Sequence, residues 1–361
     1  MKKLLALICL LIIFPLNVKS LSTSASQGIL MDMESKRIFY SKDIHKVKSV
    51  ASISKIMTAI LTIENIDVNK EITVGDEINT SYGSGIYIKK GEKLKIIDLL
   101  YGLMLRSGND ASLSLAKNTF GSVEKFVIQM NNLAKEIGMK NTTFNNPNGL
   151  DEEAGNYSTV YDMALLTSYA SQNELYQKIV STKKYTLKTN MNTYIWYNKH
   201  RLVNNYKYAT GGKTGFTKIA KRTLVTTACK DGLNLVAVTF NDGNDFLDHQ
   251  NLFEEVFKNY KNYVIVENGD LEIDDDFYKI LYTKKEFKYP LSKEEVNTVK
   301  VDYELEKVRS IKEETKVGVA RIYLGDEEIG SIDIYTNKKI DNKVEKIGFF
   351  QKIKRWFSTL W

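Results

Sequence analysis

Three short motifs in this 361-residue chain carry the side chains needed for serine acyl transfer. They occur in the order Ser52-Ile-Ser-Lys55, Ser107-Gly-Asn109 and Lys213-Thr-Gly215. Each motif alone is weak evidence, because Ser181-Thr-Lys-Lys184 and Ser171-Gln-Asn173 repeat two of the patterns elsewhere. Those two repeats lie in reversed order within a polar stretch, whereas Ser52 opens an apolar run. The order and context of the three motifs therefore predict one site.

The pair Ser52 and Lys55 predicts a nucleophile and its base. At this spacing in a helix, the two side chains lie on one face, one turn apart. A serine hydroxyl needs a base to remove its proton, but an ordinary lysine is protonated at neutral pH. The pKa of Lys55 must therefore be lowered, which partial burial and a second cation would achieve. We expect Lys213 to be that cation.

The other polar side chains of the motifs have matching roles. The Ser107 hydroxyl can pass a proton between Lys55 and the leaving amine. The Asn109 amide both donates and accepts hydrogen bonds, so it can hold a substrate peptide bond. We expect Thr214 to contribute to substrate binding beside Lys213.

Two elements must position these groups. Residues 51–59 read as a helix whose first turn contains Ser52, so unsatisfied backbone N–H groups there form one wall of an oxyanion hole. Residues 213–217 lie upstream of a β-branched run and read as an edge strand. In that strand, Gly215 allows a substrate backbone to approach closely, and an N–H of the strand can supply the second oxyanion donor.

The chain resembles the serine-type D-alanyl-D-alanine carboxypeptidases, which are low-molecular-weight penicillin-binding proteins. The resemblance covers roughly residues 28–257 and includes the segments 146–151 and 157–164 besides the three motifs. It implies that a peptidoglycan stem peptide ending in D-Ala-D-Ala acylates Ser52, that the terminal D-alanine leaves, and that water hydrolyses the acyl-enzyme. It also implies that β-lactams acylate Ser52 and inhibit the protein.

The implied fold is an α/β (α+β) catalytic domain of the penicillin-binding protein and β-lactamase type, with helices on a mainly antiparallel sheet. Farther along, apolar residues alternate between residues 299 and 334, and Gly325-Asp326 reads as a hairpin turn. This pattern predicts a small antiparallel β domain that serves as a spacer. We expect a signal peptide over residues 1–20, the catalytic domain over 21–262, the β domain over 263–342 and an amphipathic helix over 343–361.

The chain departs from the family pattern in two places. Many members carry histidine where this chain has Phe216, but the role at that position belongs to the backbone N–H. Members often place an arginine later in the chain to bind the substrate carboxylate, and the matching stretch 241–248 is acidic and contains none. We expect Arg222, at the start of the next strand, to take over that role.

The first residues predict export. A positive start, Met1-Lys-Lys3, precedes an apolar run from Leu4 to Leu16 that is too short to span a membrane, and residues 18–20 offer a cleavage site. Cleavage after Ala25 and an uncleaved membrane anchor are the alternatives. We expect the mature protein on the outer face of the cytoplasmic membrane.

The cysteines and histidines do not indicate a further reactive site. Cys9 lies in the apolar leader, so Cys229 would be the only cysteine of the mature chain, and we expect it to be a buried strand residue. His45, His200 and His249 are scattered among polar neighbours without ligand spacing. We therefore expect neither a metal nor a cofactor.

The net charge of +7 comes from the two ends of the chain. Residues 1–20 carry +3 and residues 343–361 carry +4, so the rest is neutral and a nucleic-acid partner has no support. In the tail, residues 349–361 place aromatic and apolar side chains at helical spacing between three cations. They predict a helix that lies on an anionic membrane surface, with a helix docked on the protein itself as the alternative.

Two rival functions remain open from the sequence. A β-lactamase would share the fold and the nucleophile but would deacylate fast, and the chain lacks a clear Glu-x-x-x-Asn-type loop for a water-activating base. A catalytically idle wall-binding protein would not need every polar group that the chemistry requires. The sequence does not indicate the third residue of the stem peptide, the growth stage or the oligomeric state.

Overall fold

The computed structural model describes residues 21–151, 155–308, 311 and 314–337. The predicted signal peptide over 1–20 and the predicted helix over 343–361 lie outside the described residues.

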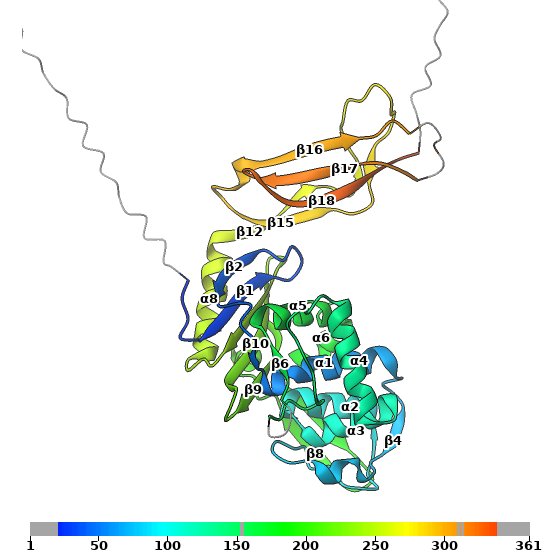
Figure 1. Ribbon diagram of the computed structural model, residues 1–361, viewed down its shortest axis with the longest axis vertical. Helices are drawn as coiled ribbons and strands as arrows, with labels where there is room; N and C mark the ends of the chain where they lie inside the picture. Colours follow the sequence, from blue (N-terminus) through cyan, green and yellow to red (C-terminus); the bar gives the residue numbers. More distant parts are fainter. Residues whose placement is uncertain (1–20, 152–154, 309–310, 312–313, 338–361) are drawn as a thin grey trace, which may run out of the picture. The chain divides into compact units, whose positions relative to one another are not determined.

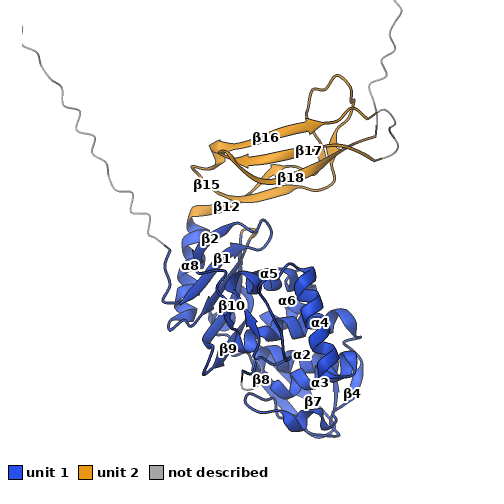
Figure 2. Ribbon diagram, viewed as in Figure 1, with its two compact units in different colours: residues 1–230, 234–258 blue, residues 231–233, 259–361 orange. Residues whose placement is uncertain are grey.

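Two compact units make up the chain (Figure 2). The first contains residues 1–230 and 234–258, and the second contains 231–233 and 259–361. The units thus divide at Asn259, a few residues before the domain boundary expected at residue 263.

A five-stranded sheet forms the centre of the first unit (Figure 1). Its strand order is β2-β1-β11-β10-β9, with β1 antiparallel to β2 and β11, and β10 antiparallel to β9. The mainly antiparallel sheet predicted for the catalytic domain is therefore confirmed. Its strands are β1 (Gln27–Asp32), β2 (Ile38–Lys42), β9 (Ala209–Thr217), β10 (Lys221–Lys230) and β11 (Leu233–Phe240).

Helices cover both faces of this sheet (Figure 1). One face carries α8 (Asp245–Asn259), and the other carries α5, α6 and the helices packed behind them. Because both faces are covered, residues 223–228 of β10 are buried without alternation. The helices of the second group are α1 (Lys55–Asn65), α2 (Ile96–Tyr101), α3 (Asn109–Phe120), α4 (Val123–Glu136), α5 (Val160–Ala170) and α6 (Glu174–Ser181). The short helix α7 (Arg201–Asn205) instead lies beside α8, where Arg201 stacks over Phe246.

Helix α1 is the hub of the core. Its residues Lys55 to Thr62 are all buried, and it packs against α3, α4, α5 and α6. A helix enclosed on all sides holds its side chains in fixed positions, which suits the residue that must orient a nucleophile.

Short paired strands and turns complete the first unit. The pairs are β3 (Lys48–Ser49) with β6 (Tyr157–Ser158), β4 (Glu71–Thr73) with β5 (Lys93–Lys95), and β7 (Lys184–Lys188) with β8 (Thr193–Tyr197). The turns are the 3₁₀ helices η1 (Ala51–Ser54) and η2 (Asp76–Thr80) and the π-helix η3 (Gly102–Arg106).

The second unit is antiparallel β structure, as predicted. One sheet has the order β13-β14-β18-β17-β16, and β12 pairs with β15. The turn between β17 and β18 contains Gly325 with φ of +62°, which confirms the predicted hairpin. The elements are β12 (Tyr260–Val266), β13 (Gly269–Asp270), β14 (Tyr282–Thr283), β15 (Phe287–Ser292), η4 (Val296–Thr298), β16 (Val299–Leu305), β17 (Thr315–Leu324) and β18 (Glu327–Thr336). Across the described ranges of both units, no helix is long and apolar enough to cross a membrane.

Candidate active site

Ser52 lies in the 3₁₀ turn η1, immediately before α1 begins at Lys55. The helix predicted over residues 51–59 is confirmed, except that its first turn is tighter than an α-helix. Ala51 opens that turn with φ of +51°, a left-handed conformation that is uncommon for a residue with a side chain. The strained turn holds the Ser52 hydroxyl 3.0 Å from the Lys55 amine.

The Lys55 amine contacts three oxygen atoms. They are Ser52 Oγ at 3.0 Å, Asn109 Oδ1 at 2.8 Å and the carbonyl oxygen of Asn148. A neutral amine has two N–H donors and one lone pair, and the two carbonyl oxygens can only accept. In the neutral amine those carbonyls therefore take both N–H bonds, which leaves the lone pair for the Ser52 hydroxyl proton.

Burial makes the neutral form of Lys55 accessible. The side chain is fully buried, and burial holds its pKa well below the ordinary value. The positive charges of Lys213 and Lys199 lower that pKa further, while Asp110 acts in the opposite direction. The predicted cause, burial plus Lys213 as a second cation, matches the direction and the order of these effects.

The Ser107 motif begins at the end of η3, where Ser107 has φ of +65°. The Asp110 carboxylate, in the first turn of α3, accepts hydrogen bonds from the backbone N–H groups of residues 86–88. It thereby ties the start of α3, next to the Ser107 motif, to that loop. Ser107 lines the cavity beside Ser52 but makes no hydrogen bond to Lys55 among the described residues. The expected proton relay is therefore not yet formed in this arrangement.

The Asn109 side chain makes two hydrogen bonds within the protein, which the sequence did not indicate. Its Oδ1 accepts from Lys55, and its Nδ2 donates to the carbonyl oxygen of Tyr82 at 2.6 Å. One Nδ2 hydrogen remains for a substrate carbonyl. The side chain thus orients the base as well as offering a substrate contact.

The third motif lies on β9, which is an edge strand of the sheet as predicted. Lys213 is 2% exposed and donates to the carbonyl oxygen of Thr214 at 2.7 Å. Burial, followed by the charge of Lys199, lowers its pKa to about 7. At Gly215, an added Cβ would lie 2.4 Å from Thr223 Oγ1 and 3.1 Å from the backbone nitrogen of Ser52, so only glycine fits there.

One cavity of 480 Å³ joins the predicted groups. The predicted site residues Ser52, Ser107, Thr214, Gly215, Phe216 and Arg222 line it, together with Ser84, Lys199, Thr223, Asp245 and Phe246. The side chain of Phe216 is 65% exposed. Lys55, Asn109 and Lys213 are buried.

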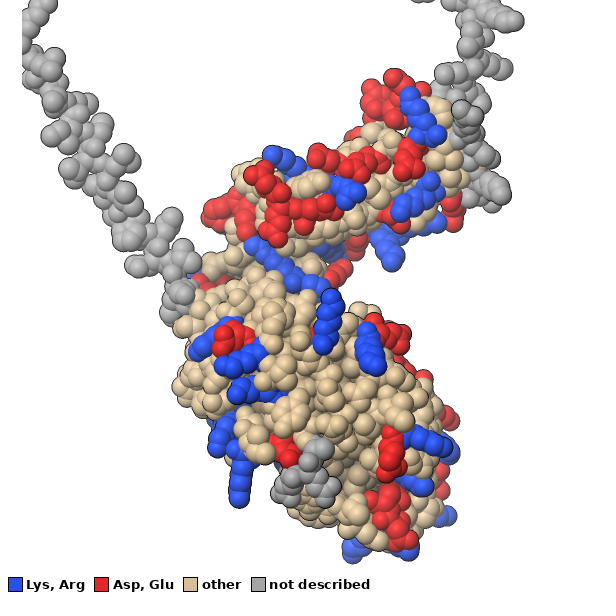
Figure 3. Space-filling model, viewed as in Figure 1, with Lys and Arg blue, Asp and Glu red and all other residues tan. Residues whose placement is uncertain are grey.

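Arg222 lies on β10 directly opposite Phe216. Its Nε and Nη2 donate to the two carboxylate oxygens of Asp245 at 3.0 and 2.6 Å, and this pairing raises its pKa. Asp245, which belongs to the acidic stretch 241–248, therefore offsets the charge of Arg222, the residue that we expected to bind the substrate carboxylate. Arg222 reaches the cavity, but as half of an ion pair. On the face seen in Figure 3, Lys and Arg side chains gather over the part of the first unit that contains β9 and β10.

The sequence does not indicate that the loop carrying Asn148 contacts the Lys55 amine. Gly149 has φ of +83°, and an added Cβ there would lie 2.1 Å from the carbonyl oxygen of Ala51. The segment Asn146-Pro-Asn-Gly149 carries a recognisable turn signal, but a backbone carbonyl has no side-chain signature. The close approach of Gly149 sets the position of that carbonyl under η1.

Gly149→Ala is expected to lower both stability and acylation. The left-handed conformation alone costs about 1–2 kcal/mol for alanine, and the clash with Ala51 adds to it by displacing the turn that carries Ser52. Gly138→Ala is the matched control, since Gly138 has φ of +82° and nothing within 4 Å of its added Cβ. Thermal unfolding and the rate of penicillin labelling would be measured for both. Equal losses in the two variants would contradict the role of the close contact.

Two histidines that are far apart in the sequence contact the hydroxyl of one buried threonine, Thr226. His200 Nε2 and His249 Nδ1 are 3.1 and 2.8 Å from Thr226 Oγ1, and His249 Nε2 is 3.0 Å from Thr239 Oγ1. Burial lowers the pKa of His200 to about 4 and that of His249 to about 3. The two histidines are therefore buried core groups, and His249 joins α8 to the sheet.

Cys229 lies in β10 as predicted, but it is only half-buried. The prediction of a fully buried side chain is therefore wrong. Cys229 is the second-last residue of its strand.

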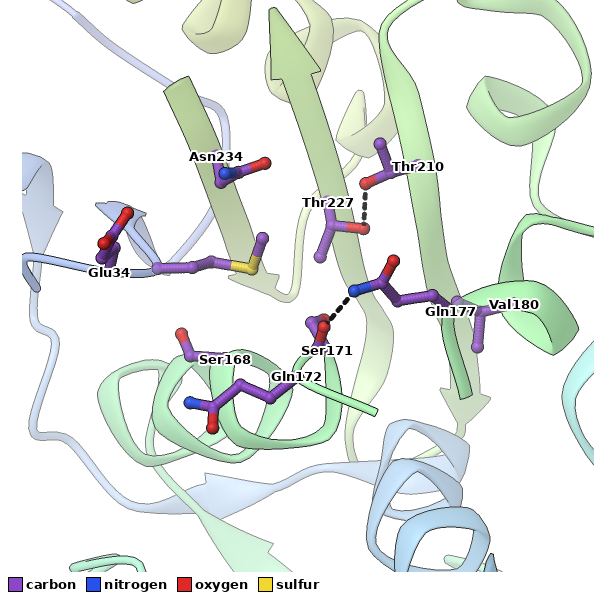
Figure 4. A pocket seen from close by; sticks show the side chains of 10 residues that line it. Glu34, Ser168, Ser171, Gln172, Gln177, Val180, Thr210, Thr227 and Asn234 are labelled. Atoms are coloured by element: carbon purple, nitrogen blue, oxygen red, sulfur yellow. Dashed lines mark hydrogen bonds between the residues drawn. The ribbon is translucent and has the colours of Figure 1, made fainter. Parts of the chain in front are cut away.

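The repeated motif at Ser171 lies at a different cavity (Figure 4). That cavity measures 390 Å³, and its polar lining consists of hydroxyls, amides and the carboxylate of Glu34. Asn173 instead caps α6 by accepting from the backbone of Tyr176. Ser181 bonds back to the carbonyl of Lys178. No lysine lines this cavity in the described part of the chain, so neither repeat forms a second acyl-transfer site.

Comparisons with known proteins agree with this arrangement. Residues 16–244 match the family described as D-alanyl-D-alanine carboxypeptidase, and residues 256–342 match the C-terminal domain of penicillin-binding protein 5. The D-alanyl-D-alanine carboxypeptidase DacF of Bacillus subtilis is 37% identical over 61% of this chain and 58% of its own length. The D-alanyl-D-alanine carboxypeptidase of Streptomyces sp. K15 is 32% identical over 59% of this chain and 79% of its own.

The fold also matches a solved structure. Penicillin-binding protein 5 from Haemophilus influenzae aligns with a TM-score of 0.77 over 88% of this chain and 98% of that one, at 24% identity. This likeness confirms the predicted catalytic fold followed by a β domain. The family match covers more than half of the sequence, and it includes all three motifs. The chain belongs to the D-alanyl-D-alanine carboxypeptidase family.

Proposed function

We propose that this chain is a serine-type D-alanyl-D-alanine carboxypeptidase that removes the terminal D-alanine from peptidoglycan stem peptides. The observation that carries the proposal is the 3.0 Å contact between Ser52 and a fully buried Lys55 at a cavity that the three motifs line or underlie. The lowered pKa of Lys55 favours its neutral form, and its two carbonyl partners take both N–H bonds of that form. One lone pair then remains for the Ser52 hydroxyl proton. That is the arrangement of an activated nucleophile.

Acylation would begin when Ser52 gives its proton to Lys55 and attacks the carbonyl carbon between the two D-alanines. The backbone N–H groups of Ser52 and Phe216 would stabilise the oxyanion that forms. Gly215 supports this, because it brings β9 next to the Ser52 nitrogen. The C–N bond then breaks, and Ser107 passes the proton from Lys55 to the leaving amine. Water would hydrolyse the Ser52 ester by the same groups used in reverse.

The substrate would bind along the edge of β9. An extended peptide can add to an exposed sheet edge through main-chain hydrogen bonds. Asn109 would donate its remaining N–H to the peptide, and Lys213 and Thr214 would bind the end of the substrate. The Arg222 guanidinium keeps Nη1 unbonded among the described residues, so it can still reach the terminal carboxylate while paired with Asp245.

One experiment tests the function and its rivals. The protein is incubated with labelled penicillin, and intact mass is followed over time, while D-alanine release from a diacetylated Lys-D-Ala-D-Ala peptide is measured in parallel. A long-lived adduct with D-alanine release supports the carboxypeptidase. Rapid loss of the adduct with hydrolysed penicillin indicates a β-lactamase, and the absence of both reactions indicates an idle binding protein.

We further propose that the protein is exported, loses residues 1–20 and is held on the outer face of the cytoplasmic membrane by residues 349–361. The charges and aromatic side chains of that segment support attachment to an anionic surface. The β domain would then act as the spacer between the membrane and the catalytic unit.

Removal of the tail is expected to abolish membrane binding and to leave penicillin binding intact. A chain of residues 21–361 should sediment with anionic vesicles, in a partly salt-sensitive manner, and a chain of residues 21–342 should not. Replacing Trp356 and Phe357 together with alanine should weaken sedimentation more than Ser358→Ala does. Sedimentation of the shortened chain, or a soluble mature chain, would favour a helix docked on the protein.

A further inference from the structure

One carboxylate joins three segments that surround the nucleophile. Asp151 Oδ1 accepts a hydrogen bond from Ser49 Oγ at 2.6 Å, and Asp151 Oδ2 accepts one from Thr217 Oγ1. Ser49 is the last residue of β3, just before the turn η1, and Thr217 is the last residue of β9. Asp151 itself follows the loop that supplies a carbonyl to the base. Its two oxygens therefore connect that loop both to the segment before the nucleophile and to the substrate strand.

The loop before Asp151 is held by its own hydrogen bonds. Asn146 Oδ1 accepts from the backbone N–H groups of Asn148 and Gly149 at 3.2 and 2.6 Å. Asn146 Nδ2 donates to the carbonyl oxygen of Leu150 at 2.9 Å. The carbonyl of Asn148 is the one that contacts the base. Because these bonds make the loop rigid, a change in the position of Asp151 would also move that carbonyl.

The end of β9 is the segment that most needs this contact. In the described sheet, β9 is an edge strand with a partner strand on one side only. At Gly215, an added Cβ would lie 3.1 Å from the backbone nitrogen of Ser52, so the strand passes close to the nucleophile. Phe216, whose N–H would be the second oxyanion donor, lies between Gly215 and Thr217. The Asp151 contact with Thr217 thus helps to set the distance between the two N–H groups.

We propose that Asp151 is a positioning residue for acylation, because its carboxylate holds the end of β9 where the N–H groups of Ser52 and Phe216 can both bind the oxyanion. The proposal rests on the carboxypeptidase function proposed above. Asp151 does not line the Ser52 cavity in the described part of the chain, so it acts through Thr217 and Ser49. The oxyanion forms only during the reaction. A displaced β9 should therefore slow the chemical step more than it weakens noncovalent binding.

Asp151→Ala is expected to lower the rate constant of acylation by penicillin by on the order of 10- to 100-fold, as a misplaced oxyanion donor does. The dissociation constant of the noncovalent penicillin complex should change by less than about 3-fold, since that complex contains no oxyanion. Stopped-flow labelling over a range of penicillin concentrations separates the two constants. It would be run well below the unfolding temperature of each variant. Asp151→Asn should recover most of the rate, because its amide can accept from Ser49 and donate to Thr217.

Asp162→Ala is the matched control for a purely structural effect. Asp162 is also a buried carboxylate with two ties, to the backbone N–H of Asn141 at 2.7 Å and to Thr142 Oγ1 at 2.8 Å. Neither of these partners lines the Ser52 cavity. Asp162→Ala should lower the unfolding temperature at least as much as Asp151→Ala, but it should leave the acylation rate constant of the folded protein unchanged.

Thr217→Val separates the contact to β9 from the contact to β3. It removes the hydroxyl with little change in volume, so it should reproduce most of the loss in acylation. Combining it with Asp151→Ala should then cost little more than either change alone. An unchanged acylation rate constant in Asp151→Ala, or an equal loss in Asp162→Ala, would overturn the inference. If the unchanged protein is labelled by penicillin but releases no D-alanine from diacetylated Lys-D-Ala-D-Ala, the proposed function fails, while the acylation rates still decide the role of Asp151.

Discussion

Ser52→Ala is expected to abolish penicillin labelling and D-alanine release completely. The Ser52 hydroxyl is the group that shares its proton with the free lone pair of Lys55, and alanine removes the atom that forms the acyl bond. Ser52 is only partly buried, and the Lys55 amine keeps its two carbonyl partners without the hydroxyl, so the fold should persist. Intact mass after labelled penicillin and a D-alanine assay would measure the two losses.

The matched control is Ser181→Ala. Ser181 has the same Ser-x-x-Lys spacing, but its hydroxyl bonds to the carbonyl of Lys178 in an exposed turn. This variant should label and hydrolyse at the original rate. A stable penicilloyl adduct on the Ser52→Ala protein would show that another residue is the nucleophile.

Lys55→Arg is expected to lose nearly all acylation. A guanidinium stays protonated in proteins and has no lone pair to accept the Ser52 proton. The change also places a permanent charge and a larger side chain at a fully buried position, so thermal stability should fall as well. Stopped-flow labelling with a fluorescent penicillin would give the acylation rate.

The control for this change is Lys184→Arg, since Lys184 is the exposed lysine of the repeated motif. It should alter neither the rate nor the unfolding temperature. Retention of more than about a tenth of the original acylation rate by Lys55→Arg, a barrier change below ~1.4 kcal/mol, would exclude Lys55 as the base.

Local patterns predicted the parts of the site that depend on side-chain type and short spacing. The Ser52–Lys55 contact follows from one turn of helix, and the edge position of β9 follows from a glycine-containing strand placed before a buried, β-branched one. The antiparallel β domain followed from period-two runs and one turn. Each of these is decided by neighbours within about ten residues, which a sequence displays directly.

The features of the site that the sequence did not predict depend on tertiary contacts between distant segments. The Asn148 carbonyl that completes the Lys55 site is a backbone group, which every residue has. The pairing of Arg222 with Asp245 links β10 to α8, and His200 and His249, which are far apart in the sequence, both contact Thr226. Neither the periodicity nor the spacing of residues in the sequence indicates such tertiary contacts. They explain why the Arg222–Asp245 pair and the shared contacts of Thr226 were not predicted.

Burying two lysines beneath the cavity also has a cost in folding free energy. The unfolded chain binds protons on Lys213 up to about pH 10.4, whereas the folded chain binds them only below about pH 7. Between those values the unfolded state carries more protons, so stability declines as the pH falls from about 10 towards 7, by on the order of a few kcal/mol. Lys55, shifted in the same direction, adds to the decline. The protein therefore favours the neutral form of its reactive amine by giving up part of its thermodynamic stability at neutral pH, and an inactive version with apolar residues at these positions would be the more stable fold.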